Sequence, residues 1–143
     1  MKAGIDLGTT LVKAAWMKDG QYQLASTADS SLEDITRRIK TDGVKDISLV
    51  GINWTADRLL TLADFNIINH GEQTVEREIA TQASGVKELL KIQGNNLESY
   101  LLVSVGSGTS YTTVSGNQTN HEEPGNPLGG KTIERLGLVF GAK

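Results

Sequence analysis

Two apolar segments of the sequence end in the same short pattern of glycines and hydroxyl residues. Residues 2–7 lead into Gly8-Thr9-Thr10, and residues 100–105 lead into Gly106-Ser107-Gly108-Thr109-Ser110. A turn of this kind gathers backbone N–H groups and hydroxyls, which together can bind anionic oxygens. Asp6, just before the first turn, could hold Mg²⁺, which prefers one or two carboxylates plus substrate phosphates. One such turn is also an ordinary hairpin connection, but two of them favour a polyphosphate bound from opposite sides.

Apolar periodicity predicts the elements around these turns. Three strands in a meander come first, at residues 2–7, 11–18 and 22–27, and Asp19-Gly20 is typical of a type I′ hairpin turn. A capping box of Ser30 and Glu33 starts a helix that Gly43 ends. A buried strand at residues 47–52, a short helix at 55–63 and a weak strand at 65–68 follow. After them come a long helix at 75–93, a second buried strand at 100–105, a hairpin formed by 109–114 with 117 onward, and a final helix from 130. The order predicts a three-layer α/β fold with a mixed sheet.

Composition excludes several function classes. The chain has 143 residues, and we expect it to form a single domain over residues 1–143. A net charge of −3 offers no basic surface for nucleic acid, and no apolar run is long enough for a membrane span. The absence of cysteine excludes thiolate metal sites and is compatible with the cytoplasm. His70 and His121 lie in polar loops without partners at ligand spacing, so a zinc site is not expected.

A third glycine cluster matches a phosphate-binding pattern but lacks its structural context. Gly125-Asn126-Pro127-Leu128-Gly129-Gly130-Lys131-Thr132 fits G-x-x-x-x-G-K-[ST], the P-loop motif. The residues before it are polar and unlike a central strand, and too few follow it for a crossover and a second strand. We therefore expect no P-loop fold here, although glycines before a helix N-terminus still present N–H groups to an anion.

One carboxylate is a candidate for proton transfer. Glu78 lies in the first turns of the predicted long helix, and Gly85 on the same face leaves space for a close neighbour. The helix macrodipole by itself favours acidic residues at this helix start, and it accounts for Glu76 equally well. Spacing alone therefore leaves the choice between Glu76 and Glu78 open.

Taken together, these segments resemble the actin-like ATPase and sugar-kinase superfamily, and within it the type II pantothenate kinases. The first family motif, G-I-D-x-G-x-T-x-x-K, is found at residues 4–13, and the second, V-G-[ST]-G-T-S, at residues 105–110. A glutamate that opens a long helix precedes the second motif, and a glycine-rich stretch before a final helix follows it. The resemblance implies a ribonuclease-H-like lobe with a mixed five-stranded sheet, three antiparallel strands followed by parallel ones, and helices on both faces.

The resemblance also implies roles for individual residues. Asp6 would bind Mg²⁺, while the turn formed by Gly8, Thr9 and Thr10, together with Lys13, would bind the β- and γ-phosphates of ATP. The turn formed by Gly106, Ser107, Gly108, Thr109 and Ser110 would face the same phosphates, and Gly129 and Gly130 would help to enclose the nucleotide. Glu78 would accept the proton of the substrate hydroxyl. The implied function is the phosphorylation of pantothenate by ATP, a step of coenzyme A biosynthesis.

Three positions depart from the family pattern. His121-Glu122-Glu123 stands where the family has an arginine that binds pantothenate, which leaves the phosphoryl acceptor open, and Lys131 and Arg135 replace family glycines. The family binds its nucleotide between two lobes, and this chain, ending at Lys143, is expected to supply only the first. We therefore expect it to be inert alone, to need the second lobe, and to be able to form a homodimer. The alternatives are a non-kinase ATPase, a nucleotide-sensing module or an assembly domain of the same superfamily.

Overall fold

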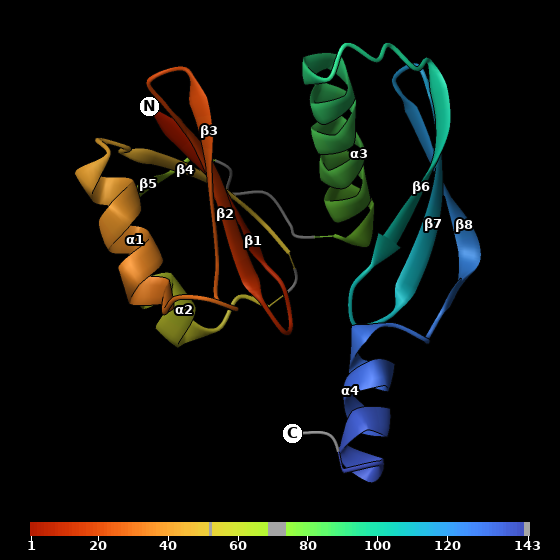
Figure 1. Cartoon of the computed structure of the whole chain (residues 1–143). Coiled ribbons are helices and arrows are strands. Elements are labelled where there is room, and N and C mark those ends of the chain that lie inside the picture. The colour runs from red at the N-terminus through yellow and green to blue at the C-terminus, as the bar shows by residue number, and fades with distance from the viewer. Residues whose placement is uncertain (52, 69–73, 142–143) are drawn as a thin grey trace. The chain divides into compact units, whose positions relative to one another are not determined.

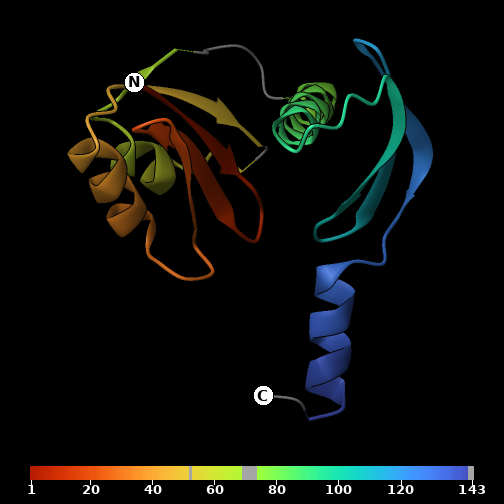
Figure 2. The same cartoon turned by 45° about the horizontal axis from the view of Figure 1, so that its top comes forward.

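The chain divides into two compact units, each with its own sheet (Figure 1 and Figure 2). The computed structural model describes residues 1–51, 53–68 and 74–141, and the units are Met1–Val75 and Glu76–Lys143. The expected strand end at residue 52 and the loop position of His70 lie outside the described residues. The expectation of a single lobe over residues 1–143 stays a prediction.

The first unit contains a mixed five-stranded sheet. Its strands are β1 (Lys2–Leu7), β2 (Val12–Lys18), β3 (Gln21–Ser26), β4 (Asp46–Val50) and β5 (Asn66–Ile67). They lie in the order β3-β2-β1-β4-β5. Neighbours among the first three strands pair antiparallel, whereas β4 pairs parallel to β1 and β5 parallel to β4. The mixed five-stranded sheet expected from the sequence is therefore confirmed, with the two-residue β5 as its fifth strand.

The tight turn between β2 and β3 has the geometry that its sequence predicts. Asp19 and Gly20 both have positive φ angles, of 50° and 77°. A type I′ turn requires this at both central residues, and its twist matches that of the flanking strands. The turn fixes the register from Lys18 opposite Gln21 onward. Along its other edge β2 pairs with β1, where Trp16 lies opposite Ala3 and both side chains are buried.

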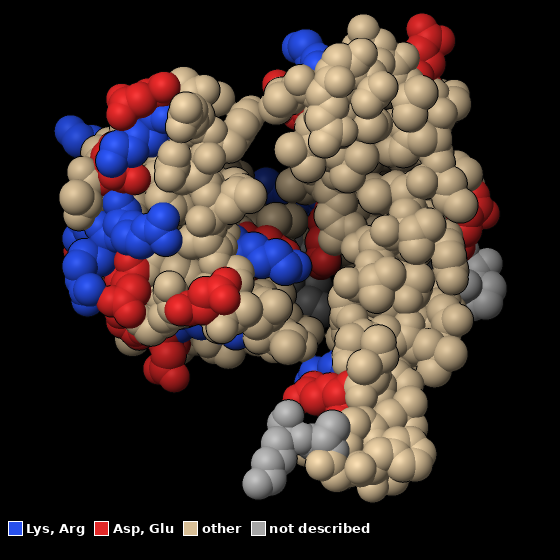
Figure 3. All heavy atoms as spheres, viewed as in Figure 1, with Lys and Arg blue, Asp and Glu red and all other residues tan. Residues whose placement is uncertain are grey.

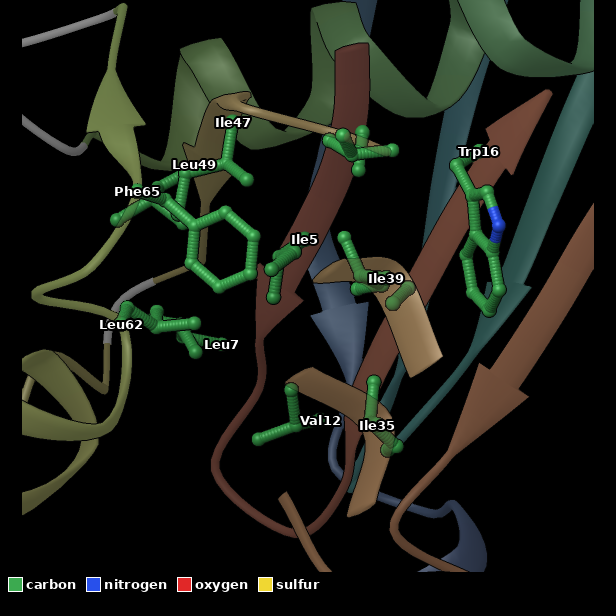
Figure 4. Close-up of a cluster of buried hydrophobic side chains, with 13 residues drawn as sticks. Ile5, Leu7, Val12, Trp16, Ile35, Ile39, Ile47, Leu49, Leu62 and Phe65 are labelled. Carbon is green, nitrogen blue, oxygen red and sulfur yellow. The ribbon is translucent and has the colours of Figure 1, made fainter. Parts of the chain in front are cut away.

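Two helices cover one face of this sheet. They are α1 (Leu32–Thr41) and α2 (Ala56–Thr61). Alternate side chains of β1 and β2 are buried, so only one face of these strands belongs to the core. Ile35 and Ile39 of α1 and Leu62 just after α2 pack into that core (Figure 4). Full burial of an aliphatic side chain of this size stabilises the fold by about 1.5–3 kcal/mol.

Helix α1 begins one residue later than its sequence indicates. The N-cap is Ser31, whose Oγ accepts a hydrogen bond from the backbone N–H of Asp34 at 3.1 Å. The expected capping box of Ser30 and Glu33 is therefore wrong by one position, because two adjacent serines offer the same capping chemistry. Gly43 follows the end of the helix with a φ of 80°, as expected for a terminating glycine.

The second unit combines a long helix with a three-stranded antiparallel sheet. Its elements are α3 (Val75–Ile92), β6 (Ser99–Val105), β7 (Thr109–Ser115), β8 (Gln118–Asn126) and α4 (Gly130–Val139), and the strand order is β6-β7-β8. The Tyr100 hydroxyl donates a hydrogen bond to the carbonyl of Ala83 at 3.0 Å, and Lys87 donates to the turn between β7 and β8. Ile79 and Ala83 of α3 are buried, as is Val114 of β7. These contacts hold α3 against the sheet.

The strand expected to be buried at residues 100–105 is an edge strand instead. Leu101, Val103 and Val105 lie on one face of β6 and are 56%, 46% and 66% exposed. The expectation of burial is therefore wrong for this face. A continuous apolar run indicates that a segment forms a strand, but it does not establish that both faces of the strand are covered.

Helix α4 leaves most of its large apolar side chains exposed. The exposed apolar side chains at its surface and C-terminal end are Ile133, Leu136, Leu138, Val139 and Phe140. The helix itself begins at the expected residue. None of the described helices is both long enough and apolar enough to cross a membrane.

A cluster of polar contacts fastens the end of α1 to β2. Nε1 of Trp16 donates a hydrogen bond to Oδ2 of Asp42 at 2.9 Å, and the ammonium of Lys18 donates to Oδ1 of the same carboxylate. The guanidinium carbon of Arg38 lies 5.4 Å from the centre of the Trp16 ring. Lys18 and Trp16 favour the charged carboxylate, so the pKa of Asp42 lies below its ordinary value.

We predict that Asp42 makes the stability of the first unit dependent on pH. Its pKa is lower in the folded chain than in the unfolded chain, so its contribution is complete above the unfolded pKa and is lost as the pH falls through the folded pKa. Thermal melting between about pH 7 and about pH 2 will therefore show a smaller loss of stability on acidification for Asp42→Asn than for the wild type. Parallel pH profiles for the two proteins would contradict this role.

Candidate functional site

The turn between β1 and β2 places Asp6 beside Gly8. A Cβ on Gly8 would lie 2.7 Å from the carbonyl oxygen of Leu11, so the turn closes too tightly for a side chain at this position. Asp6 pairs across the strands with Lys13, whose Nζ lies 3.4 Å from Oδ2 of Asp6. Thr9, at the tip of the turn, is exposed, as is Thr10. A ligand can therefore reach the hydroxyls of this turn.

The second oxygen of Asp6 has the surroundings of a cation ligand. Oδ1 is buried and has no hydrogen-bond partner among the described residues. Gly51, just after β4, has a φ of 98°, and a Cβ there would lie 2.7 Å from this oxygen and from the Leu7 backbone. A buried oxygen without a partner is costly, and Mg²⁺ satisfies such an atom while it keeps several water ligands. The described residues contain no group of three or more potential metal ligands, a number that Mg²⁺ does not require.

Arg58 of α2 holds the same turn. Its Nη1 donates a hydrogen bond to the carbonyl of Gly8 at 2.8 Å and lies 3.4 Å from the carbonyl of Asn53. The N–H of Asn53 in turn donates to the carbonyl of Leu7 at 3.1 Å. Sequence reasoning did not find Arg58, because 50 residues separate it from Gly8 and no local pattern connects the two.

The second turn, between β6 and β7, is closed by its own backbone. The N–H of Gly106 donates to the carbonyl of Gly108 at 2.7 Å, and Val105 pairs with Thr109. The Thr109 hydroxyl donates to the carbonyl of Leu128 at 2.7 Å, which ties the turn to the third glycine cluster.

The third glycine cluster packs directly on this second turn. Gly129 is the buried N-cap residue of α4, and a Cβ there would lie 2.7 Å from Cα of Gly108 and from the carbonyl oxygen of Ser107. The N–H of Gly130 donates to the carbonyl of Gly106 at 2.8 Å. The structure thus brings two of the three glycine clusters together within one unit.

Residues 125–132 open a helix, as their P-loop-like pattern requires, but they follow the wrong kind of strand. β8 pairs antiparallel with β7 and lies at the edge of its sheet. A P-loop connects a strand to the helix of a βαβ unit, in which the strands are parallel. The topology therefore agrees with the expectation that this cluster is not a P-loop.

Glu78 lies in the first turn of α3, where the sequence places it. It is half-buried and accepts a hydrogen bond from Nε2 of Gln82 at 3.3 Å, whereas Glu76 is exposed. No described heavy atom lies within 4 Å of the position of a Cβ on Gly85. The space that Gly85 leaves is therefore open among the described residues. The assignment of Glu78 as the base stays a prediction.

Three of the residues that depart from the family pattern, Glu122, Lys131 and Arg135, lie on the surface of the second unit. Oε1 of Glu122, on β8, accepts hydrogen bonds from the Thr113 hydroxyl at 3.0 Å and from Nδ2 of Asn120 at 3.1 Å. Lys131 and Arg135 are exposed on α4. The two hydrogen bonds hold the Glu122 carboxylate in place, so this face of the sheet carries a fixed acceptor of hydrogen bonds.

Comparison with solved structures assigns the fold class. A Ppx/GppA family member from Aquifex aeolicus matches 97% of this chain and 54% of its own, with a TM-score of 0.52 and 19% identity. The ethanolamine utilization protein EutJ from Carboxydothermus hydrogenoformans matches 99% of this chain and 57% of its own, with a TM-score of 0.52 and 14% identity. The chain has the fold of the actin-like ATPase and sugar-kinase superfamily.

Sequence comparison identifies a narrower relationship. No protein-family model matches the chain. Type II pantothenate kinases from Staphylococcus aureus strains, including USA300 and the bovine strain RF122, are 31% identical to it over 140 residues, or 98% of its length. The chain spans 49% of these relatives. It is therefore related to type II pantothenate kinases over about half of their length, and the resemblance drawn from its motifs is confirmed.

We predict that the contact between the second and third glycine clusters tolerates no side chain. Gly129→Ala would place a Cβ 2.7 Å from backbone atoms, which forces a shift of α4 or of the turn, and we expect a loss of about 1–3 kcal/mol. The matched control is Gly85→Ala, in open space within α3, which should gain about 0.5–1 kcal/mol. Urea denaturation of both variants measures these changes. A Gly129→Ala protein as stable as the wild type would show that the contact is not formed in solution.

Proposed function

We propose that this chain is the nucleotide-binding part of an ATP-dependent kinase that phosphorylates a hydroxyl of pantothenate. Its similarity to type II pantothenate kinases over 98% of its length supports the family assignment. The observation that carries the proposal is Asp6, whose buried oxygen without a partner lies next to the turn at Gly8. A site for Mg·ATP needs both features, a carboxylate for the cation and a tight turn for the phosphates.

In this proposal the first unit holds the phosphates. Asp6 would bind Mg²⁺, which when bound neutralises charge on the β- and γ-phosphates. The hydroxyls of Thr9 and Thr10 would donate hydrogen bonds to phosphate oxygens. Lys13, whose Nζ lies 3.4 Å from Asp6, would add positive charge beside them.

The second unit would supply the other turn and the base. The turn from Gly106 to Ser110, packed on Gly129 and Gly130, would offer the hydroxyls of Ser107 and Ser110 to a nucleotide, because the N–H of Gly106 and the hydroxyl of Thr109 already donate to backbone carbonyls. Glu78 would accept the proton of the acceptor hydroxyl while that oxygen bonds to the γ-phosphorus. The bond from this phosphorus to the bridging oxygen then breaks, and ADP leaves with the electron pair.

The partners of the chain form part of the same proposal. Residues 1–143 would act as one lobe and would be inert without a second lobe, because an open site loses its electrostatic preorganisation to water. A homodimer would cover exposed apolar side chains such as Leu89 and Ile92 of α3 and Phe140. A cytoplasmic location is compatible with the cysteine-free sequence.

A second candidate function is an ATPase or nucleotide-sensing module of the same superfamily without pantothenate chemistry. Glu122 favours it, because this carboxylate is held in place by Thr113 and Asn120 where the resemblance places an arginine for pantothenate. A carboxylate would repel the carboxylate of pantothenate, whereas an arginine would pair with it. Nucleotide binding by the two turns would be unaffected.

We expect the native gene product to release ADP from Mg·ATP only when pantothenate is present. Asp6→Asn should lower kcat by at least about 100-fold, because the cation loses its carboxylate ligand. Asp64→Asn, which removes an exposed carboxylate paired with Lys40, is the matched control and should leave the rate unchanged. A coupled assay for ADP measures both. ADP release independent of pantothenate would favour the second candidate function, and an unaffected Asp6→Asn protein would contradict both.

A second pair of variants tests the base. Glu78→Gln keeps the shape of the side chain but cannot accept the proton, so we expect kcat to fall by about 10²–10⁴-fold with little change in the KM for ATP. Glu76→Gln, two residues earlier on the same helix, should retain most of the activity. The reverse pattern in the same ADP assay would assign the base to Glu76 and contradict the role of Glu78.

A further inference from the structure

We propose that Arg58 is a positioning residue for the phosphate-binding turn at residues 8–10 and acts through the peptide group between Gly8 and Thr9. The inference rests on the proposed function, since it concerns the same nucleotide site. Its starting point is the hydrogen bond of 2.8 Å from Nη1 of Arg58 to the carbonyl of Gly8, the first residue of the turn.

The planarity of the peptide group links this bond to the ligand side of the turn. In a trans peptide the C=O of one residue and the N–H of the next point in opposite directions. When Arg58 holds the carbonyl of Gly8, it therefore also fixes the direction of the N–H of Thr9, which points away from the guanidinium. Thr9 is an exposed residue of the turn, and in the proposal its N–H, opposite the guanidinium, is the donor that a phosphate meets.

The charge of Arg58 strengthens the same donor. A guanidinium is positively charged, and its hydrogen bond to a carbonyl is charge-assisted. Such a bond polarises the peptide group, which makes the N–H at its other end a stronger donor. The bond is partly buried, so water screens it less than it would a surface contact.

Other contacts hold the strands on either side of the turn. The N–H of Asn53 donates to the carbonyl of Leu7, and Val12 exchanges hydrogen bonds with Thr27, from its N–H to Oγ1 and from the N–H of Thr27 to its carbonyl, each at 2.9 Å. Removal of the Arg58 side chain would thus leave β1 and β2 paired and would release the turn between them. This separates a positioning role from a general role in folding.

The test compares Arg58→Met, Arg58→Lys and the matched control Arg37→Met in the ¹⁵N-labelled native gene product. Methionine and lysine have helix propensities close to that of arginine, so α2 should persist in both variants. Lysine keeps a charged donor, whereas methionine keeps only the apolar stem. Arg37, on the exposed surface of α1, pairs with Asp34, and its replacement removes one positive charge away from the turn.

The first measurement is the backbone order parameter of the amides without nucleotide, from ¹⁵N relaxation. We expect the order parameter of the Thr9 amide to fall from about 0.85, the value of rigid backbone, to below about 0.6 in Arg58→Met, because the peptide group between Gly8 and Thr9 loses the hydrogen bond that fixes its direction. The order parameters of Ile5 and Ala14 in the neighbouring strands should be unchanged. Arg58→Lys should be intermediate and Arg37→Met should match the wild type. An unchanged order parameter at Thr9 in Arg58→Met would overturn the proposal.

The second measurement is calorimetric titration with Mg·ATP and with AMP. We expect the Kd for Mg·ATP to rise about tenfold in Arg58→Met, less in Arg58→Lys, and not at all in Arg37→Met. The affinity for AMP, which lacks the β- and γ-phosphates, should not change. Equal losses for both nucleotides, or none for Mg·ATP, would overturn the proposal. If the wild type does not bind Mg·ATP, the proposed function fails, and the order parameter of the Thr9 amide still decides whether Arg58 holds the turn.

Discussion

The parallel pairing of β1 with β4 is the interaction on which the first candidate site depends. This pairing brings the end of β4 against the end of β1, so that Gly51 closes over Asp6 and over the backbone of Leu7. The same pairing brings the segment after β4 to the turn between β1 and β2. There Asn53 donates a hydrogen bond to the carbonyl of Leu7, and Arg58 donates one to the carbonyl of Gly8. At a free strand end, the Asp6 oxygen would be hydrated like any surface carboxylate. Its burial without a partner is therefore a product of the sheet and not of the local motif.

The two candidate turns share one structural device and differ in how they are anchored. At each turn a glycine from another element occupies a position where a Cβ would lie 2.7 Å from its neighbours: Gly51 at the first and Gly129 at the second. The charged side chain of Arg58 donates a hydrogen bond to the first turn, whereas the N-terminus of α4 donates one to the second. The glycines in this sequence therefore act across elements as well as within their own turns, and the close approach of backbones is as important here as conformational freedom.

Features that depend on neighbouring residues were accessible from the sequence, and features that depend on distant ones were not. The type I′ turn at Asp19-Gly20 and the long α3 follow from local preferences, which explains their agreement with the structure. The N-cap is Ser31 and not the expected Ser30, because both serines satisfy the same capping rule. The exposed face of β6 could not be predicted, since an apolar run does not show which other elements cover it. Arg58 and the contact of Gly129 with the second turn required the fold itself, because tertiary pairing alone brings them to the turns.

The meander that opens the first sheet has a consequence for the order of assembly. β1, β2 and β3 are joined by short connections, so little chain entropy is lost when they pair. The pairing of β4 with β1, which places Asp46 opposite Lys2, closes a much longer loop. We expect the hairpins to form first and the parallel strand to join them afterwards. Gly51 and Arg58 reach the turn between β1 and β2 only when β4 pairs or afterwards. An early folding species therefore contains the turn but lacks the residues that complete the anion site around it. Any ligand of this turn would then bind and stabilise the completed sheet rather than guide its formation.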